Sequence, residues 1–200
     1  MRKLLIMVAV LSFLLSTALL AQEYVVDKGV IHFSGTVSFE SRGGDLYEVY
    51  DDDLRERRVS IYSINPSFLY FVMPNLSIGG EFLYDRLSTT DESLSIFGLG
   101  PRAAYYFGEE DRGSYPYMGA SFLFAKIGED GTITVNRNFY PEGTLIRITP
   151  FAGVVFMVSK NVGVSVEVYA KIDSFKAKGG DKSYKGDIFG LRFGIAGFIF

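Results

Sequence analysis

The sequence predicts an all-β protein: an eight-stranded, antiparallel, up-and-down β-barrel that spans a membrane, preceded by a cleaved helical signal peptide. Three observations predict this fold. One long apolar segment stands at the N-terminus, and no second one follows it in the 200 residues. The rest of the chain alternates apolar and polar side chains with a period of two, which indicates strands. The connections between these strands are short at one end and longer at the other.

The composition excludes several classes of protein. Without Cys, the chain has no disulfide framework, thiolate zinc site or lipoprotein anchor, and a single His, His32, excludes a multi-histidine metal cluster. The 18 Phe and 13 Tyr residues argue against disorder. A formal net charge of −3 is far from the basic balance of a nucleic-acid binder. We therefore expect one folded domain with no cofactor, no metal and no nucleic-acid partner.

Residues 1–21 have the three-part layout of a secretory signal peptide. Arg2 and Lys3 supply a positive region, an almost unbroken apolar run follows, and Ala18 and Ala21 are candidate cleavage positions. The alternative is an uncleaved membrane anchor. We interpret the segment as an export signal and residues 22–200 as one barrel domain. Since no later stretch resembles a spanning helix, only a closed barrel would place this domain in a membrane.

Eight segments of the mature chain are predicted strands. In the first, apolar or small side chains occupy the odd positions from Ile31 to Phe39, and polar ones occupy the even positions. Residues 76–85 and 162–171 show the same period. A tilted strand of this length crosses an apolar slab of about 25 Å. The predicted strands are, in order, 30–40, 59–72, 76–85, 94–107, 115–125, 145–158, 162–172 and 188–200.

The connections are sorted by length. The short ones are Met73-Pro74-Asn75, residues 108–114 and Ser159-Lys160-Asn161, and two of these have tight-turn chemistry. Outer-membrane barrels have short periplasmic turns and longer extracellular loops, and an even strand count puts both termini on the side of the turns. The predicted outer loops are 41–58, 86–93, 126–144 and 173–187.

Two features of the strands need an explanation. Pro66, Pro101 and Pro150 lie inside the second, fourth and sixth strands, where each removes a ladder donor, and we interpret them as tolerated kinks. In the last strand, Phe198 and Phe200 fall on the face opposite to that of the other apolar residues. A β-bulge near Gly194 or Gly197 is expected to reconcile the two faces.

Several motifs resemble a family. Residues 64–71 with 74–80 resemble the second hairpin of small outer-membrane β-barrel proteins of the OmpA/OmpX type, and residues 100–107 resemble their fourth strand. The ending Phe198-Ile199-Phe200 is similar to the aromatic C-terminal signal that the barrel-assembly machinery recognises in this family. The resemblance covers the mature chain. It implies assembly into the bacterial outer membrane, with that machinery as a partner, and says little about activity.

Charged residues on the polar faces are predicted to lie in the lumen. An eight-stranded barrel is just wide enough for its own side chains to fill it, and charges there must be paired. We expect two cross-strand bridges, Glu81 with Arg102 and Arg147 with Glu167. The alternative is that these charges line a narrow pore.

The pair His32 and Ser34 on the first strand offers one candidate for catalysis. Barrel lipid hydrolases resemble it, with a His and a Ser exposed to lipid. Here, however, both residues share a face with polar side chains that should point into the lumen. We interpret His32 as a luminal, hydrogen-bonded residue and predict no catalytic residues.

The function expected from these features is that of a non-enzymatic integral membrane protein, monomeric, whose loops stabilise the envelope or contact another surface. The alternatives are a small porin, a lipid-modifying enzyme and a soluble barrel of lipocalin type with its apolar face inward. Outer-membrane lipids are expected to contact the barrel through interfacial aromatic residues, and lipopolysaccharide through lysines of the last loop. These aromatic residues are Tyr70, Tyr84, Tyr105 and Phe107, and the lysines are Lys176, Lys178, Lys182 and Lys185.

Overall fold

A computed structural model of the chain describes residues 25–43, 60–88, 93–108, 113–129, 143–177 and 183–200. The predicted signal peptide, residues 1–21, lies outside the described residues. Within the described ranges, no helix is long and apolar enough to cross a bilayer.

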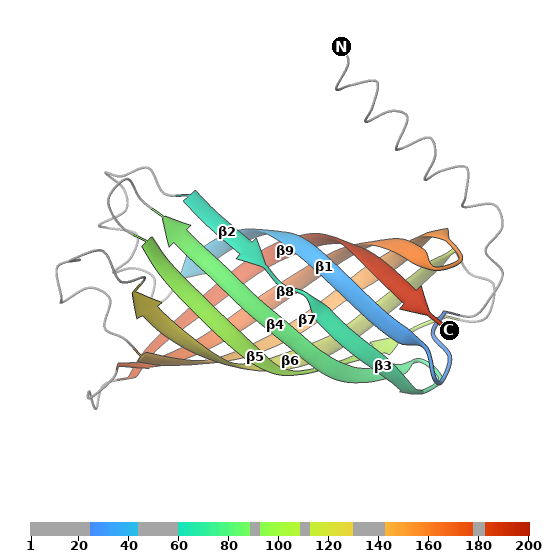
Figure 1. The fold of residues 1–200 in the computed structure, drawn as a ribbon, viewed down its shortest axis with the longest axis horizontal. Helices are drawn as coiled ribbons and strands as arrows, with labels where there is room; N and C mark the ends of the chain where they lie inside the picture. The colour runs from blue at the N-terminus through green and yellow to red at the C-terminus, as the bar shows by residue number, and fades with distance from the viewer. Residues whose placement is uncertain (1–24, 44–59, 89–92, 109–112, 130–142, 178–182) are drawn as a thin grey trace, which may run out of the picture.

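The described chain forms one closed antiparallel β-barrel (Figure 1). β1 pairs with β3 on one side and with β9 on the other, and β4 pairs with β5, so the sheet closes on itself. β2 and β3 together form one interrupted strand of the wall, which makes the barrel eight-stranded as predicted. The strands are β1 (Ile31–Gly43), β2 (Ser60–Ile64), β3 (Ser67–Met73), β4 (Leu76–Ser88), β5 (Ser93–Tyr106), β6 (Ser114–Glu129), β7 (Gly143–Ser159), β8 (Val162–Ala177) and β9 (Ser183–Ile199).

The two ends of the barrel differ. One end, called the turn end below, holds the start of β1, the C-terminus and the tight turns after β3 and β7 (Figure 1). Asn75 in the first of these turns has a φ of 68°, a left-handed conformation that Asn tolerates better than most residues. The other end, called the loop end, holds the last residues of β1, β4, β6 and β8.

At the loop end the strands are longer than predicted. The predicted loops 41–58, 126–144 and 173–187 all lose residues to strands, because β1, β6 and β8 run on and β7 and β9 begin earlier. The prediction ended each strand where the apolar alternation ended. Backbone pairing between neighbouring strands does not need that alternation, so the ladder continues past the apolar slab. Residues 44–59, 89–92, 130–142 and 178–182 of these connections lie outside the described residues.

The prolines act differently from one another. Pro66 divides the predicted strand 59–72 into β2 and β3, since it has no N–H to donate to the ladder. Its carbonyl still accepts a hydrogen bond from the Phe82 N–H at 2.9 Å. Pro101 and Pro150 lie inside β5 and β7 without ending them, opposite Gly80 and Ala120. All three proline side chains are exposed on the outer surface.

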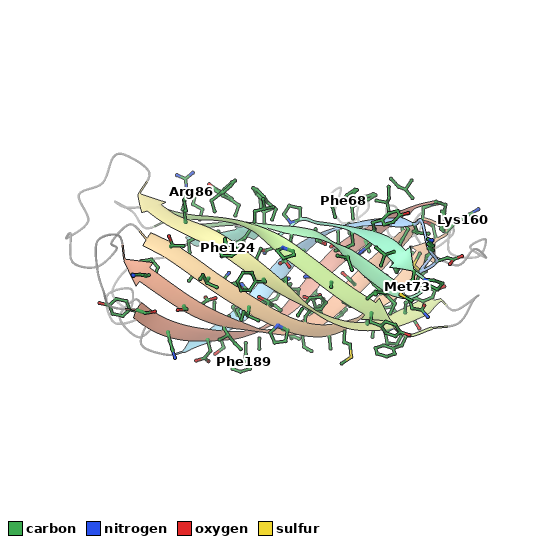
Figure 2. The ribbon with its side chains drawn as sticks, turned by 90° about the horizontal axis from the view of Figure 1, so that it is seen from below. Phe68, Met73, Arg86, Phe124, Lys160 and Phe189 are labelled. Carbon is green, nitrogen blue, oxygen red and sulfur yellow. The ribbon has the colours of Figure 1, made fainter. Side chains whose placement is uncertain are left out.

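The outer surface of the barrel is apolar. On every described strand the outward positions through the middle of the wall carry apolar or small side chains, and Figure 2 shows Phe68, Phe124 and Phe189 among them. Charged outward residues, such as Arg86 on β4, lie toward the loop end (Figure 2). A barrel of lipocalin type has the opposite arrangement, with its apolar face inward. The soluble alternative is therefore wrong, and the surface is the one that lipid requires.

The predicted interfacial aromatic residues lie on this outer surface. Tyr70, Tyr105 and Phe107 are exposed near the turn end, where the Tyr105 and Phe107 rings pack edge to face with centroids 5.1 Å apart. Tyr84 is half-buried and lies in the loop-end half of β4. These positions suit an aromatic girdle at each membrane interface.

Residues 25–30, for which the sequence predicted no secondary structure, close the lumen at the turn end. Val25, Val26 and Val30 are buried in the hydrophobic core of the barrel. Backbone hydrogen bonds hold the segment: the Asn75 N–H donates to the Val26 carbonyl at 2.8 Å, and the Gly29 N–H donates to the Phe71 carbonyl at 2.9 Å. Residues 25–30 therefore form a cap across this end, called the N-terminal cap below.

The last strand alternates without a bulge. The registers of β9 with β1 and with β8 run without a shift, so the expected bulge near Gly194 or Gly197 is wrong. Phe198 points inward and is buried, and its ring stacks on that of His32 at 4.8 Å between centroids. Phe198 faces inward, unlike its apolar neighbours, because its side chain belongs to the hydrophobic core of the turn end. Phe200 lies beyond the last residue of β9 and is exposed.

Candidate functional site

The lumen of the barrel contains a dense set of charged side chains. An uncompensated charge in such a place is very costly, so each needs partners within hydrogen-bonding or ion-pairing distance. All but Glu40, which is half-buried, are buried. The bases are Arg102, Arg147, Lys171 and Arg192, and the acids are Glu40, Glu81, Asp85, Glu167 and Asp173.

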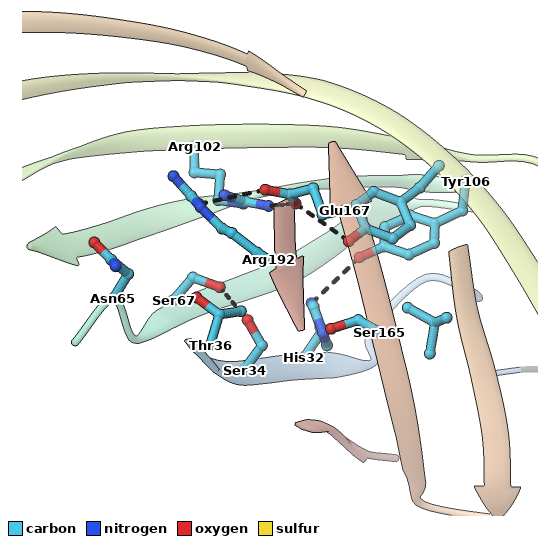
Figure 3. Close-up of a pocket in the computed structure, with 12 residues that line it drawn as sticks. His32, Ser34, Thr36, Asn65, Ser67, Arg102, Tyr106, Ser165, Glu167 and Arg192 are labelled. Atoms are coloured by element: carbon cyan, nitrogen blue, oxygen red, sulfur yellow. Dashed lines mark hydrogen bonds and ion pairs between the residues drawn. The ribbon is translucent and has the colours of Figure 1, made fainter. Parts of the chain in front are cut away.

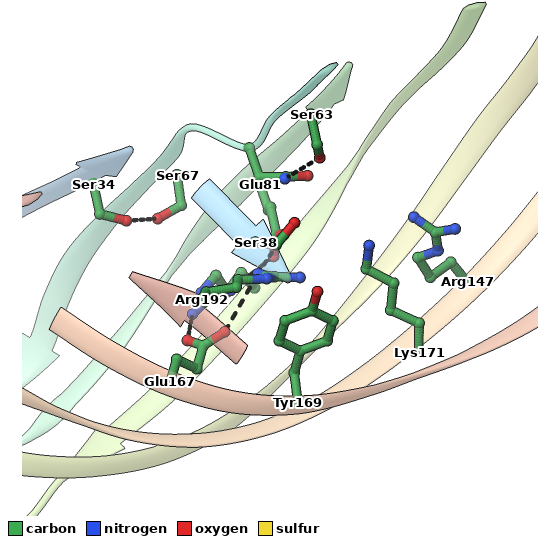
Figure 4. A network of polar contacts seen from close by, with 12 residues as sticks. Ser34, Ser38, Ser63, Ser67, Glu81, Arg147, Glu167, Tyr169, Lys171 and Arg192 are labelled. Carbon is green, nitrogen blue, oxygen red and sulfur yellow. Dashed lines mark hydrogen bonds and ion pairs between the residues drawn. The ribbon is translucent and has the colours of Figure 1, made fainter. Parts of the chain in front are cut away.

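Four of these residues form a closed ring of alternating charge in the middle of the lumen. Arg102 contacts Glu81 at 2.9 Å and Glu167 at 2.6 Å. Arg192 contacts the same two acids, Glu81 at 3.1 Å and Glu167 at 3.3 Å. Each acid therefore lies between two arginines, and each arginine lies between two acids. We call this arrangement the Arg–Glu ring; Figure 3 shows Arg102, Arg192 and Glu167, and Figure 4 shows Glu81 with Glu167 and Arg192.

The Arg–Glu ring links opposite parts of the wall. Glu167 on β8 and Arg192 on β9 are direct cross-strand partners, and Glu81 on β4 is diagonal to Arg102 on β5, whose direct partner is Gly79. The two remaining contacts cross the lumen between these strand pairs. Bidentate and shared contacts of this kind suit the planar, multiply donating guanidinium group.

Aromatic side chains surround the Arg–Glu ring. The Arg102 guanidinium lies 3.7 Å from the centroid of Phe151, and that of Arg192 lies 4.2 Å from the centroid of Tyr169. The Tyr117 hydroxyl donates to Glu167 at 3.2 Å. Aromatic faces stabilise desolvated cations, so these rings support the two buried arginines.

A second network lies toward the loop end. Arg147 on β7 forms a two-point contact with its direct cross-strand partner Asp173, Nε to Oδ1 and Nη2 to Oδ2, each at 2.7 Å. Its Nη1 lies 3.8 Å from Asp85 on β4. Lys171 on β8 pairs with Glu40 on β1, which also accepts a hydrogen bond from the Tyr169 hydroxyl at 2.8 Å. Figure 4 shows Tyr169 between Arg192 and Lys171, at the junction of the two networks.

The contacts of the four residues in the predicted bridges differ in part from the prediction. Glu81 and Arg102 lie together, at 2.9 Å. The predicted bridge between Arg147 and Glu167 is wrong, because Arg147 pairs with Asp173 and Glu167 pairs with two other arginines. The error has a simple origin: the seventh predicted strand, 162–172, ended before Asp173, so the prediction assigned the true partner of Arg147 to a loop.

Sequence reasoning placed Glu40, Asp85 and Lys171 on polar strand faces without assigning them partners, and it missed two further members of the lumen. The signal that would have found them is the two-residue period itself, extended beyond the apolar slab. Inward positions on β8 follow one another as 167, 169, 171 and 173, and the alternation of β9 places position 192 inward. The missed residues are Asp173 and Arg192.

His32 lies in the lumen, at the turn-end side of the Arg–Glu ring (Figure 3). Its Nδ1 faces the Tyr106 hydroxyl at 3.3 Å. The Ser34 hydroxyl is hydrogen-bonded to that of Ser67 at 2.8 Å. Among the described residues, therefore, His32 and Ser34 have separate partners and do not form a base–nucleophile pair, which would require a hydrogen bond between them.

A small polar cavity lies between His32 and the Arg–Glu ring. Its volume is about 10 Å³, and its lining includes Thr36, Asn65 and Ser165 (Figure 3). A space of this size holds about one water molecule. Within the parts of the chain that the structure describes, no group of three or more His, Cys, Asp or Glu side chains could hold a metal ion.

The fold is that of small outer-membrane barrels of known structure. Neisserial surface protein A superposes with a TM-score of 0.55 and 15% identity, covering 85% of this chain and 99% of that one. OprG of Pseudomonas aeruginosa gives 0.49 and 12%, covering 86% and 97%. The N-terminal barrel domain of OprF from the same organism gives 0.44 and 13%, covering 84% and 98%. No protein-family model and no curated protein matches the chain.

Proposed function

We propose that this chain is a non-enzymatic protein of the bacterial outer membrane whose closed barrel anchors surface loops, with the turn end in the periplasm. The observation that carries the proposal is the Arg–Glu ring, because it fills the middle of the lumen with side chains that neutralise one another. Its four residues, Glu81, Arg102, Glu167 and Arg192, are each at most 7% exposed. A conducting pore needs hydrated charges, and these are desolvated.

Two further observations support a closed lumen. The N-terminal cap covers the turn end with Val25, Val26 and Val30, so the ring is separated from that end by an apolar layer. The polar cavity beside the ring has room for about one water and not for a continuous file of them. Eight-stranded barrels are in general filled by their own side chains.

The same proposal includes that the chain is exported, that the barrel-assembly machinery inserts it into the outer membrane, and that it is a monomer. Residues 1–21 would direct export, and the terminal Phe198 and Phe200 would be read by the barrel-assembly machinery. The separate partners of His32 and Ser34 support the absence of a lipid hydrolase activity, because neither group is placed to activate the other.

Conductance in a planar lipid bilayer tests the proposal. The purified full chain is expected to give no steps above background at any voltage. The double variant Arg102→Ala/Arg192→Ala removes the guanidinium groups and leaves two acids with water in their place. It is expected to conduct weakly and to prefer cations, provided that a heat-dependent shift in gel mobility shows that it is folded.

The matched control is Arg86→Ala/Lys160→Ala, which removes two cations from the outside of the barrel. It should remain silent. Steady conductance by the unaltered chain, with selectivity that changes when the Arg–Glu ring is altered, would establish the small-porin alternative and overturn the closed-anchor function.

A further inference from the structure

The outer surface at the loop end carries a row of lysines. Lys126 on β6 faces Thr144 on β7, and Thr144 in turn faces Lys176 on β8, so these three lie side by side across the wall. Lys185 on β9 is the cross-strand partner of Ser174, one step nearer the middle of the barrel. All three lysines are exposed and point outward. We call them the lysine rim.

No acid neutralises the lysine rim among the residues that the structure describes. None of the three lysine side chains has an ion pair or hydrogen bond with a described residue. Asp187 is the nearest outward-facing acid of these strands, and it lies one step further from the loop end than Lys185. Among the described residues the patch therefore carries a net positive charge at the edge of the apolar surface, where an anionic group would be attracted.

An apolar groove lies directly beneath the lysine rim. Its volume is about 420 Å³, and Ile146, Ile148 and Ile172 provide its apolar lining. Ser174 at its centre is short, so the surface is hollowed between the isoleucines of β7 and β8 and the Lys185 and Asp187 side chains of β9. Phe124 and Phe189, which Figure 2 shows on the outer surface, lie on the flanking strands. Cations thus stand above an apolar hollow on the lipid-facing wall.

We infer that this surface binds a phosphorylated, multiply acylated glycolipid of the outer leaflet, a molecule of the lipid A class, with acyl chain in the groove and phosphates on the lysine rim. An apolar hollow alone would accept any lipid tail, so the charges decide the class. Lys126 and Lys185 are separated by three strand spacings, about 14 Å. One phosphate cannot contact both ends of such a row, whereas a disaccharide with a phosphate at each end offers one to each.

Asp187 favours a sugar headgroup over that of an anionic phospholipid such as phosphatidylglycerol. Its carboxylate lies on the lining of the groove, below Lys185. It would repel a phosphate placed there but accept hydrogen bonds from the hydroxyl and amide N–H groups of an acylated amino sugar. The inference rests on the proposed orientation in the outer membrane, with the loop end at the outer leaflet, and does not depend on whether the lumen conducts.

Native mass spectrometry of the full chain in detergent micelles tests the inference. The barrel is titrated with bis-phosphorylated lipid A, with phosphatidylglycerol, and with the same phosphorylated disaccharide stripped of its acyl chains. We expect one lipid A to bind at least tenfold more tightly than either comparator. Equal binding of phosphatidylglycerol, or equal binding of the stripped disaccharide, would overturn the inference, since the first means a diffuse charge effect and the second a phosphate site without a groove.

Variants separate the two parts of the site. Lys126→Gln/Lys176→Gln/Lys185→Gln should weaken lipid A binding by roughly 100-fold, since each basic side chain at such a surface contributes roughly a fivefold factor. The control Lys28→Gln/Arg86→Gln/Lys160→Gln removes the same charge elsewhere and should stay within about twofold. Single Lys176→Gln serves if the triple variant does not assemble. Equal losses in rim and control variants would contradict a defined site.

Filling the groove tests the apolar part independently. Ile148→Trp keeps the surface apolar, so insertion into lipid is preserved, but occupies the hollow. It should weaken lipid A binding severalfold and leave the weak binding of the stripped disaccharide unchanged. Unchanged lipid A binding would show that no chain enters the groove.

Discussion

Arg102 on β5 reaches across the lumen to Glu167 on β8, with 2.6 Å between the guanidinium nitrogen and the carboxylate oxygen. The two residues are separated by 65 positions in the sequence and by the width of the barrel. Through this contact and the reciprocal one between Arg192 and Glu81, the Arg–Glu ring ties together walls that share no backbone hydrogen bonds.

Removal of one arginine from the Arg–Glu ring should strongly destabilise the barrel. Arg102→Met leaves the buried carboxylates of Glu81 and Glu167 with one arginine of the ring, Arg192, between them. Breaking a buried pair in this way costs about 3–5 kcal/mol. Denaturant-induced unfolding of the folded protein in lipid vesicles measures the loss. Arg86→Met, at an exposed outward position, should stay within about 0.5 kcal/mol; a similar loss in both would mean that the ring adds nothing to stability.

The Arg147–Asp173 pair should show strong coupling. Either single substitution, Arg147→Met or Asp173→Leu, leaves a buried charge without its main partner and is expected to cost about 3–5 kcal/mol. The double variant replaces both by apolar groups of similar size and should recover more than half of either loss. A double-mutant cycle on the free energy of unfolding measures this. Additive losses would show that the two side chains act independently.

Gly190 should not tolerate a side chain. A Cβ at this position would meet the Tyr169 ring and lie 2.7 Å from the Phe39 carbonyl oxygen, and the displaced Tyr169 would lose its hydrogen bond to Glu40. Gly190→Ala is therefore expected to cost about 1–3 kcal/mol. In contrast, nothing lies within 4 Å of a Cβ built at Gly35, so Gly35→Ala is the matched control and should be nearly neutral. The same unfolding measurement compares them, and a reversed order would contradict the packing described for Tyr169.

The two phenylalanines at the C-terminus should have separable roles. Phe198 is 2% exposed and stacks on His32, so Phe198→Ala leaves a cavity and should cost about 3–5 kcal/mol of folding stability. Phe200 is 51% exposed, so Phe200→Ala should leave stability nearly unchanged while lowering the fraction of chains that assemble in cells. Unfolding of the refolded protein measures the first effect, and heat-dependent gel mobility of membranes measures the second. Normal assembly of Phe200→Ala would remove this residue from the proposed assembly signal.

The sequence predicts most of the strands of the barrel wall, but it predicts the ion pairs of the lumen less well. The two-residue period predicts the strands because every strand has lipid on one side, so that apolar and polar positions must alternate. It locates Glu81 and Arg102 inside for the same reason. It does not predict the partner of Arg147, because a lumen brings together side chains from strands that are not neighbours in the sequence, and the strand containing Asp173 extends beyond the apolar slab.

The N-terminal cap and the face of Phe198 show a second limit. Residues 25–30 carry no periodic pattern, and their position depends on hydrogen bonds to Phe71 and Asn75, which lie more than forty residues away. In the sequence, Phe198 falls on the polar, inward face of its strand. It is apolar because the interior of the barrel is apolar at the turn end, although it is polar in the middle of the lumen.

The contact of His32 with Phe198 also has a kinetic meaning. It lies at the seam between β1 and β9, where the register pairs Ile31 with Ile199, the most distant positions in the described chain to be hydrogen-bonded neighbours. Closing a loop of that length has the largest entropic cost in the barrel, and no shorter-range pairing can be substituted for it. The seam should therefore zip last, after the other hairpins have formed. A stacked pair of rings on its inner side then holds the first and last strands together against reopening.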